Sequence, residues 1–376
     1  MSSTDYLKFS RKFLEGTGLV PTSSLCKKLL SLLVFLPVCL VLNFLVVYQF
    51  ARAKGDILLI AEAFESLSTY GQLTVRKYQL LLHGNLIEEV MRDWCQNWEY
   101  NLFGDKIETE LRRKMELCIK MTKTLAFCST GTITLMCVTA LIDDKKLVPL
   151  TCFVPNYKWA AEIIFISEVI ILFETLYYVV ALDSFYLLNC MNLETQFTLM
   201  RELIKSIRFG ADDDSECLQK LVRCAQHHKS LLRLHQKLNK VYSEYFILQY
   251  TITVTAVSIQ AYLTIYRLVQ GHYKLLSHRT LKSVVYFFTV MLQVALYFIP
   301  ASNVEIEAEN YSLEIYSTNW EANTNNKIGK HLLFMLMKSQ KSLNLLGAGM
   351  LHVNRPEYLA ILRLGFTIAT ILGGLK

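Results

Sequence analysis

The sequence has 376 residues, of which 53% are hydrophobic and only 19% are charged, and its mean hydropathy is +0.30. Soluble domains carry roughly 25% charged residues, so this composition argues for a membrane protein and against a soluble globular one. The net charge of +7 matters less in such a chain than the distribution of its charges, which sets the orientation in the membrane.

Seven segments are predicted to cross a membrane. Four have no charged residue, and each has about the 20 residues that a helix needs to cross the hydrocarbon core: Leu29–Tyr48, Thr124–Ile142, Tyr245–Tyr266 and Ser283–Val304. Three others contain one to three charged residues: Ile57–Val75, Ile163–Asn189 and Tyr358–Leu375. Because lipid cannot satisfy backbone hydrogen bonds, the predicted fold class is an all-α membrane protein with seven transmembrane helices.

Lysine and arginine are divided unevenly between the two sides of this arrangement. If residues 1–28 form a cytoplasmic tail, that side holds 28 of the 39 lysines and arginines, the other side holds 10, and Arg363 lies inside the last span. Cytoplasmic loops are enriched in these residues. The sequence therefore predicts a cytoplasmic N-terminus and an extracellular C-terminus.

The segment after the fourth span, residues 191–244, is predicted to form a cytoplasmic anchor domain. Apolar residues recur at three- and four-residue steps up to Ile207 and again from Leu218 to Val241, with Gly210–Ser215 between them. This spacing gives each helix one apolar face to bury. The predicted division is a tail at 1–28, four spans with the ligand pocket at 29–190, the anchor at 191–244, two spans at 245–304, a cytoplasmic loop with an anchor helix (Lys330–Leu346) at 305–349, and a terminal helix at 356–376.

Clusters that carry catalytic or metal chemistry are not evident. His227, His228 and His235 have no cysteine or carboxylate at ligand spacing, and we expect them on a solvated surface. Trp94 and Trp98, near a basic run, are typical of a helix at the lipid headgroups, and this run has no fold signal for nucleic acid. Neither an enzyme, a metal site nor a cofactor is predicted.

The carboxylates inside the fourth predicted span have no assigned role. Glu168 and Glu174 are six residues apart, so they do not share a helix face, and Asp183 follows further on. This spacing does not favour a single proton relay.

The last fifth of the chain carries a recognisable order of parts. The motif Tyr297-Phe298-Ile299-Pro300-Ala301 ends an apolar run, and a polar segment with Tyr316 and Trp320 follows. Then come the amphipathic helix with Lys338-Ser339-Gln340-Lys341, the break Gly347-Ala348-Gly349 and the final apolar helix. This order resembles the C-terminal signature of insect odorant receptors, the seven-span ligand-gated channels of olfactory neurons.

The resemblance implies a pocket for a small volatile ligand between spans two, three, four and six, in the outer half of the membrane. Aromatic rings with one or two hydroxyls would suit a compact aromatic or heteroaromatic odorant. For each residue, span packing or lipid contact is the alternative. The candidates recur at helical spacing and are Phe64, Leu67, Met136, Thr139, Phe165, Val169, Phe173, Tyr286, Phe287 and Val290.

The resemblance also implies a pore lined by the last span from each of four subunits. Ile371 and Leu375 fall where the family has its hydrophobic gate, which blocks ions by dewetting, and Gly374 stands where the co-receptor has a polar residue. Implied partners are the odorant co-receptor Orco in a mixed tetramer, the volatile ligand and membrane lipid. The implied setting is a non-selective cation channel in the plasma membrane of the olfactory dendrite.

Three other classes remain as alternatives. A gustatory receptor would have the same fold and topology with a tastant as ligand. A G-protein-coupled receptor is opposed by the charge asymmetry and by the lack of a DRY-like triplet or an NPxxY motif in the expected spans. A secondary transporter is opposed by the absence of evident internal repeats.

Overall fold

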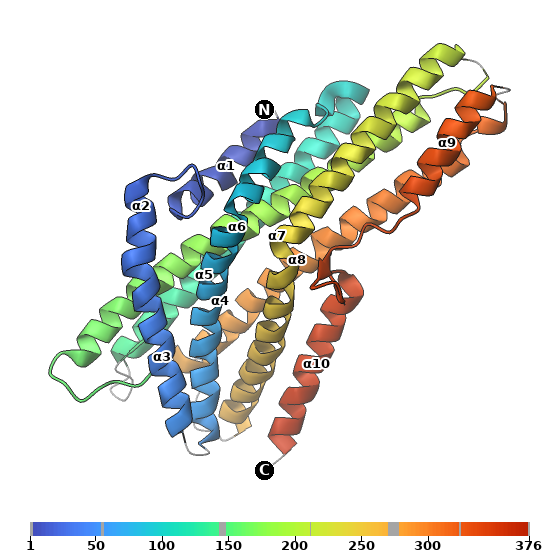
Figure 1. Cartoon of the computed structure of the whole chain (residues 1–376). Helices are drawn as coiled ribbons and strands as arrows, with labels where there is room; N and C mark the ends of the chain where they lie inside the picture. The colour runs from blue at the N-terminus through green and yellow to red at the C-terminus, as the bar shows by residue number, and fades with distance from the viewer. Residues whose placement is uncertain are drawn as a thin grey trace.

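The computed structural model describes residues 3–53, 56–142, 148–210, 212–269, 278–322 and 325–374. It is a bundle of long α-helices with one small hairpin (Figure 1). The elements are α1 (Ser3–Gly16), α2 (Leu25–Leu30), the π-helical η1 (Ser31–Phe35), α3 (Leu36–Arg52), α4 (Ile57–Asp93), η2 (Trp94–Gln96), η3 (Tyr100–Phe103), α5 (Asp105–Ile142), α6 (Ala160–Lys205), α7 (Asp214–Val269), α8 (His278–Ser317), η4 (Trp320–Ala322), α9 (Asn326–Ser339), β1 (Leu346–Gly347), β2 (Leu351–His352) and α10 (Arg355–Gly374).

Five helical stretches among the described residues are long and apolar enough to cross a membrane: Leu25–Arg52, Asp105–Ile142, Ala160–Lys205, Asp214–Leu263 and Leu281–Ser317. The other two predicted spans lie in α4 and α10, which run beside them. The predicted all-helical class is confirmed, and the first span is one continuous helical stretch from α2 through η1 to α3.

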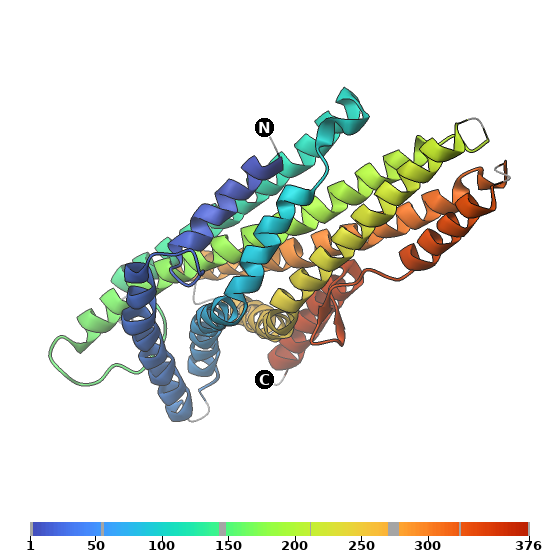
Figure 2. The same cartoon turned by 45° about the horizontal axis from the view of Figure 1, so that its top comes forward.

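α6 is the central helix of the molecule. It contacts α1, α3, α4, α5, α7 and α8, and the two views agree that it runs through the middle of the bundle (Figures 1 and 2). Every residue from Tyr178 to Met200 is buried. A helix that is buried on all sides needs neighbours around its whole circumference, so the other long helices are arranged around α6.

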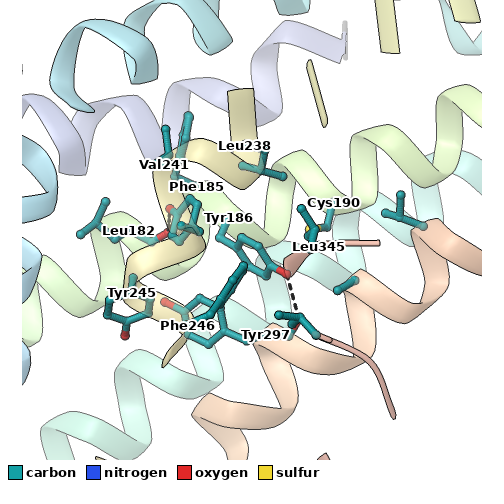
Figure 3. Packing of buried hydrophobic residues seen from close by; sticks show 14 of the residues in the cluster. Leu182, Phe185, Tyr186, Cys190, Leu238, Val241, Tyr245, Phe246, Tyr297 and Leu345 are labelled. Atoms are coloured by element: carbon teal, nitrogen blue, oxygen red, sulfur yellow. Dashed lines mark hydrogen bonds between the residues drawn. The ribbon is translucent and has the colours of Figure 1, made fainter. Parts of the chain in front are cut away.

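An aromatic cluster joins α6, α7 and α8 near the middle of the bundle. Tyr186, Tyr242, Phe246 and Tyr297 pack with ring centroids 4.9 to 6.4 Å apart. Figure 3 shows Tyr186, Phe246 and Tyr297 of this cluster. The Tyr186 hydroxyl donates to the carbonyl of Tyr297 at 2.9 Å. That carbonyl is next in the chain to the carbonyl of Leu296, which lacks a helical donor because Pro300 has no N–H, so the tyrosine adds a hydrogen bond beside the break in the α8 ladder.

Three helices extend far beyond the thickness of a membrane. α6, α7 and α8 have 46, 56 and 40 residues, or about 69, 84 and 60 Å at 1.5 Å per residue, against a hydrocarbon core of about 30 Å. Their far ends meet the connections to α7 and α9, at the end of the molecule opposite the C-terminus (Figures 1 and 2). We call residues 190–244 and 305–339, with the parts of α4 and α5 packed on them, the distal half.

The prediction of a polar loop after span six, at the start of segment 305–349, is wrong. α8 continues as a helix to Ser317, because Val304, Ala308, Tyr311 and Ile315 keep a helical spacing and are all buried. The predicted anchor helix is also displaced, since α9 ends at Ser339 and the hairpin β1–β2 replaces its last turns.

The expected solvated histidines are another correction. His227, His228 and His235 are 5%, 7% and 7% exposed, and burial lowers the pKa of each to about 4. The expectation for the tryptophans is wrong as well: Trp94 is buried in the distal half, and Trp98 stacks on His227 with ring centroids 4.2 Å apart. These rings form part of a folded core and not of a lipid interface.

Three cations counted among the connections are buried in ion pairs. Arg76 pairs with Asp183 at 2.6 Å, Lys77 with Glu174 at 2.8 Å, and Lys282 with Glu65 at 2.7 Å. Without them, the lysines and arginines assigned to the cytoplasmic side fall from 28 to 26 (28 − 2), and those on the other side fall from 10 to 9 (10 − 1). The charge asymmetry therefore survives the correction.

Candidate functional site

A cavity of about 80 Å³ lies between α4, α5, α6 and α8. The last three helices each contribute residues at the same helical spacing, i, i+3, i+4 and i+7, so each presents one face to the cavity. The wall is formed by Thr69, Gln72, Ser129, Thr132, Ile133, Met136, Leu172, Thr175, Leu176, Val179, Tyr286, Thr289, Val290 and Gln293.

Most hydroxyl groups in the wall are already satisfied by their own helices. Thr132 donates to the carbonyl of Cys128 at 3.0 Å, and Thr175 to that of Ile171 at 2.7 Å. Such a threonine presents mainly its methyl group to the cavity. The wall is thus less polar than its composition suggests, which suits a small and largely apolar occupant.

Gln72 differs from these residues. Its side chain is 8% exposed, lines the cavity, and makes no hydrogen bond to any residue that the structure describes. Its amide atoms are not among the fully buried atoms without a partner, so they are open to the cavity. Gln72 is therefore the polar group in this wall with the most to gain from a ligand that carries a hydrogen-bonding atom.

Gln293 connects the cavity to a buried polar network. Its amide donates to Asp183 at 3.0 Å, and Asp183 also accepts from the Tyr297 hydroxyl and pairs with Arg76. Arg76 in turn donates to the Tyr245 hydroxyl at 2.6 Å. One chain of hydrogen bonds thus links α8, α6, α4 and α7.

The network continues along α7 toward the terminal helix. The Tyr245 hydroxyl donates to Gln249 at 2.8 Å, and Gln249 donates to Thr253 at 3.4 Å. One turn further, Val257 meets α10 at Gly365, where a Cβ would lie only 2.5 Å from the valine Cγ1. A path of side chains therefore leads from Gln293 in the cavity wall to Val257 at α10. Each step is a direct contact except the last, from Thr253 to Val257, which spans one helical turn.

The structure brings three of the predicted ligand residues to this wall: Met136, Tyr286 and Val290. Phe173 is 49% exposed on α6, Phe64 packs against Phe50, and Phe287 packs against Phe366 of α10. The other four do not line the cavity. Leu67, Phe165 and Val169 are half-buried, and Thr139 is buried with its hydroxyl bonded to its own helix. The role of all ten in ligand binding stays a prediction.

The cavity lies several residues deeper than the sequence indicated. On α4, α5 and α6 its wall is shifted from the predicted residues by between three and seven positions toward the distal half, and on α8 it extends to Gln293. The missed residues are mostly serine, threonine and glutamine. Their sequence signal is the recurrence of such small polar residues within the apolar i, i+3, i+4, i+7 sets of three helices.

The predicted gate residues lie at the end of α10. Ile371 is 58% exposed, Gly374 is the last residue of the helix, and Leu375 lies outside the described residues. The gate therefore stays a prediction. Within the described part of the chain, groups of three or more histidine, cysteine or carboxylate side chains that could hold a metal ion are not found.

Comparison with known proteins gives three findings. The 7tm odorant receptor family model matches residues 61–366. Odorant receptor 82a of Drosophila melanogaster is 22% identical over 215 residues, which are 57% of this chain and 54% of the relative, so the chain aligns with about half of that protein's length.

Two solved structures of the insect olfactory receptor OR5 from Machilis hrabei, one of them in complex with eugenol, have the same fold. Each matches with a TM-score of 0.79 and 14% identity, over 99% of this chain and 100% or 98% of the OR5 chain. At this identity the similarity concerns the fold alone.

Proposed function

Because the chain belongs to the 7tm odorant receptor family, we propose that it is the ligand-binding subunit of a ligand-gated, non-selective cation channel in the plasma membrane of olfactory dendrites. The family match also decides against the gustatory receptor, the G-protein-coupled receptor and the transporter. The charge asymmetry supports a cytoplasmic N-terminus and an extracellular C-terminus, with the distal half in the cytosol.

The observation that carries this proposal is the cavity between α4, α5, α6 and α8. Its volume of about 80 Å³ is well below the ~300 Å³ of common small-molecule sites, which favours a compact ligand. Met136 can adapt its shape because methionine has three rotatable bonds. Gln72 and the Tyr286 hydroxyl would orient one polar atom of the odorant.

The proposed coupling is a shift between two arrangements of α10. A ligand that contacts Gln293 acts on the hydrogen-bond chain to α7, against which α10 packs. It changes the equilibrium only by the difference between its affinities for the two arrangements. Copies of α10 from four subunits, including the co-receptor Orco, would line the pore, with Ile371, Gly374 and Leu375 near its outer end.

The experiment is to express the chain with and without the co-receptor and to record currents during application of a panel of volatile compounds. We expect fast currents only in the presence of both subunits and persisting when G-protein signalling is blocked. Currents that disappear with that block would reject the channel mechanism.

Two variants test the site. Tyr286→Ala should shift the concentration for half-maximal response by roughly tenfold or more, which corresponds to about 1.4 kcal/mol. Phe127→Ala is the matched aromatic truncation on the exposed face of α5, and it should leave the response within about twofold. An equal response of both variants would place the ligand elsewhere.

A further inference from the structure

A second and more polar cavity, of about 520 Å³, lies between α4, α7 and the hairpin β1–β2. Ala348 is the apolar member of its lining, and the others are His83, His235, Gln236, Asn239, Lys240, Ser243 and Glu244. The residue that follows Glu244, Tyr245, begins an uncharged stretch of α7. The cavity therefore lies at the level where a membrane helix meets the lipid headgroups.

Several donors in this cavity are unused. His235 is 7% exposed, and its Nε2 atom is buried without a hydrogen-bond partner among the described residues. The Oδ1 atom of Asn239 accepts from the backbone N–H of Leu346 at 2.7 Å, which leaves the amide NH₂ as a donor. The Ser243 hydroxyl oxygen accepts from the N–H of Ala348 at 2.9 Å, so its hydrogen also remains.

The charges of the cavity are one of each sign. Lys240 and Glu244 are one turn apart on α7 and both are exposed, and neither forms an ion pair with a residue that the structure describes. A dianion would be repelled by Glu244, and a simple cation by Lys240. A ligand that carries one negative and one positive group satisfies both side chains and also fits the row of donors.

We propose that this cavity binds the headgroup of an ethanolamine phospholipid. The phosphodiester accepts hydrogen bonds from Asn239, Lys240 and Ser243, and the primary ammonium donates to Glu244. His235 and His83 complete the wall. Burial lowers the pKa of both imidazoles, so they meet the headgroup in the neutral form at pH 7.

The headgroup would stabilise the connection to the terminal helix. Asn239 and Ser243 hold the backbone of the hairpin through Leu346 and Ala348, and the hairpin leads directly into α10. Ala348 has a φ of +43°, a left-handed conformation that costs a non-glycine residue about 1–2 kcal/mol. A bound phosphodiester would fix the two side chains that maintain this turn.

The test uses the purified full-length chain in detergent, supplied in turn with phosphatidylethanolamine, phosphatidylglycerol and phosphatidylcholine, and native mass spectrometry to count retained lipid. We expect wild type to prefer phosphatidylethanolamine, because phosphatidylcholine has no N–H for Glu244 and phosphatidylglycerol has no cation. Lys240→Gln should retain phosphatidylethanolamine roughly tenfold more weakly, as expected for the loss of one hydrogen bond to a charged group. Equal retention of all three lipids by wild type overturns the proposal.

Two further arms sharpen the result. Glu244→Gln should lose the preference for phosphatidylethanolamine over phosphatidylglycerol, whereas Lys229→Gln, an exposed lysine elsewhere on α7, should behave as wild type. If both α7 charge variants at the cavity match Lys229→Gln, the site is rejected. If wild type binds soluble glycerophosphoethanolamine but does not retain the lipid, the ligand is a free phosphate ester and the lipid proposal is rejected. None of these measurements depends on odorant response.

Discussion

α6 and α10 are both apolar helices, yet their neighbours differ. α6 is buried on every side from Tyr178 to Met200, whereas the described part of α10 buries one narrow stripe at Ile361, Gly365 and Ala369. Its other faces expose leucine, isoleucine and phenylalanine side chains, such as those of Leu359, Phe366 and Ile371. Hydropathy alone does not distinguish a helix that fixes the core from one that is held along a single edge.

The difference shows which part of the chain can move as a unit. Displacing α6 would disrupt packing with six other α-helices, so its position is fixed by the core. α10 meets α7 at the small residue Gly365, which lets the two backbones approach closely, and its buried residues form a single stripe. A helix attached in this way can shift while the rest of the bundle stays folded.

The largest expected effect comes from breaking the centre of α6. Asp183→Asn leaves the fully buried Arg76 without its counter-ion, and the loss of one partner from such a pair costs about 3–5 kcal/mol. We expect a much lower yield of monodisperse protein and a lower thermal midpoint. Glu216→Gln, which removes an exposed ion pair with Lys220, should change stability by less than about 1 kcal/mol. Replacing both Arg76 and Asp183 by leucine or methionine should restore part of the loss, and no recovery would show that the charges themselves are required.

The second expectation concerns pH and the histidines packed around α6. The folded pKa of His227, His228 and His235 is about 4, below the unfolded value of about 6.5, so the unfolded chain binds more protons between these values. Stability is therefore full above pH 6.5 and falls as pH is lowered toward 4, by up to about 3 kcal/mol for each histidine.

Thermal unfolding of the purified protein at pH 7.5, 6.0 and 5.0 measures this dependence. His228→Leu should remove about a third of it, since three similar groups contribute. His331→Gln, at an exposed position on α9, is the control and should leave the dependence intact. A midpoint that does not change with pH would contradict burial of the three rings as neutral groups.

The third expectation tests the edge contact of α10. Gly365→Ala places a Cβ only 2.5 Å from the Cγ1 atom of Val257, and overpacking of this kind costs about 1–3 kcal/mol. It should disfavour the present position of α10 and change the ligand-independent current of the assembled channel by roughly fivefold to a hundredfold. The pair Gly365→Ala with Val257→Ala should return the current toward wild type. If Val257→Ala does not reverse the change in current caused by Gly365→Ala, the two helices are not coupled at this contact.

The smallest expected effect is at the cavity wall. Gln72→Leu removes the unsatisfied amide while keeping the side-chain volume similar, so an odorant with a hydrogen-bonding atom should lose roughly tenfold in potency. A hydrocarbon odorant of similar size should keep its potency or gain. Concentration–response curves for such a pair measure the difference, and parallel losses for both ligands would argue that Gln72 acts only through the shape of the wall.

The sequence by itself determined the class of the protein, because long uncharged stretches have few alternatives to membrane helices. It also determined the break between α6 and α7 at Gly210, where helical spacing stops. The C-terminal motif at Tyr297 and Gly347 was sufficient to suggest the family. These features depend on local composition and spacing, which can be read without knowing the partners of any helix.

Only the tertiary structure decided which faces of the helices meet. From the sequence Arg76 and Lys282 were counted as charges of the connections, but the fold places Asp183 and Glu65 beside them as ion-pair partners. From the sequence His227 and His228 look like surface residues, but Trp98 packs on the first and Phe197 and Tyr311 pack on the second. Periodicity shows that a face exists, but the partners of Asp183 lie more than 100 positions away in the sequence, which no local pattern contains.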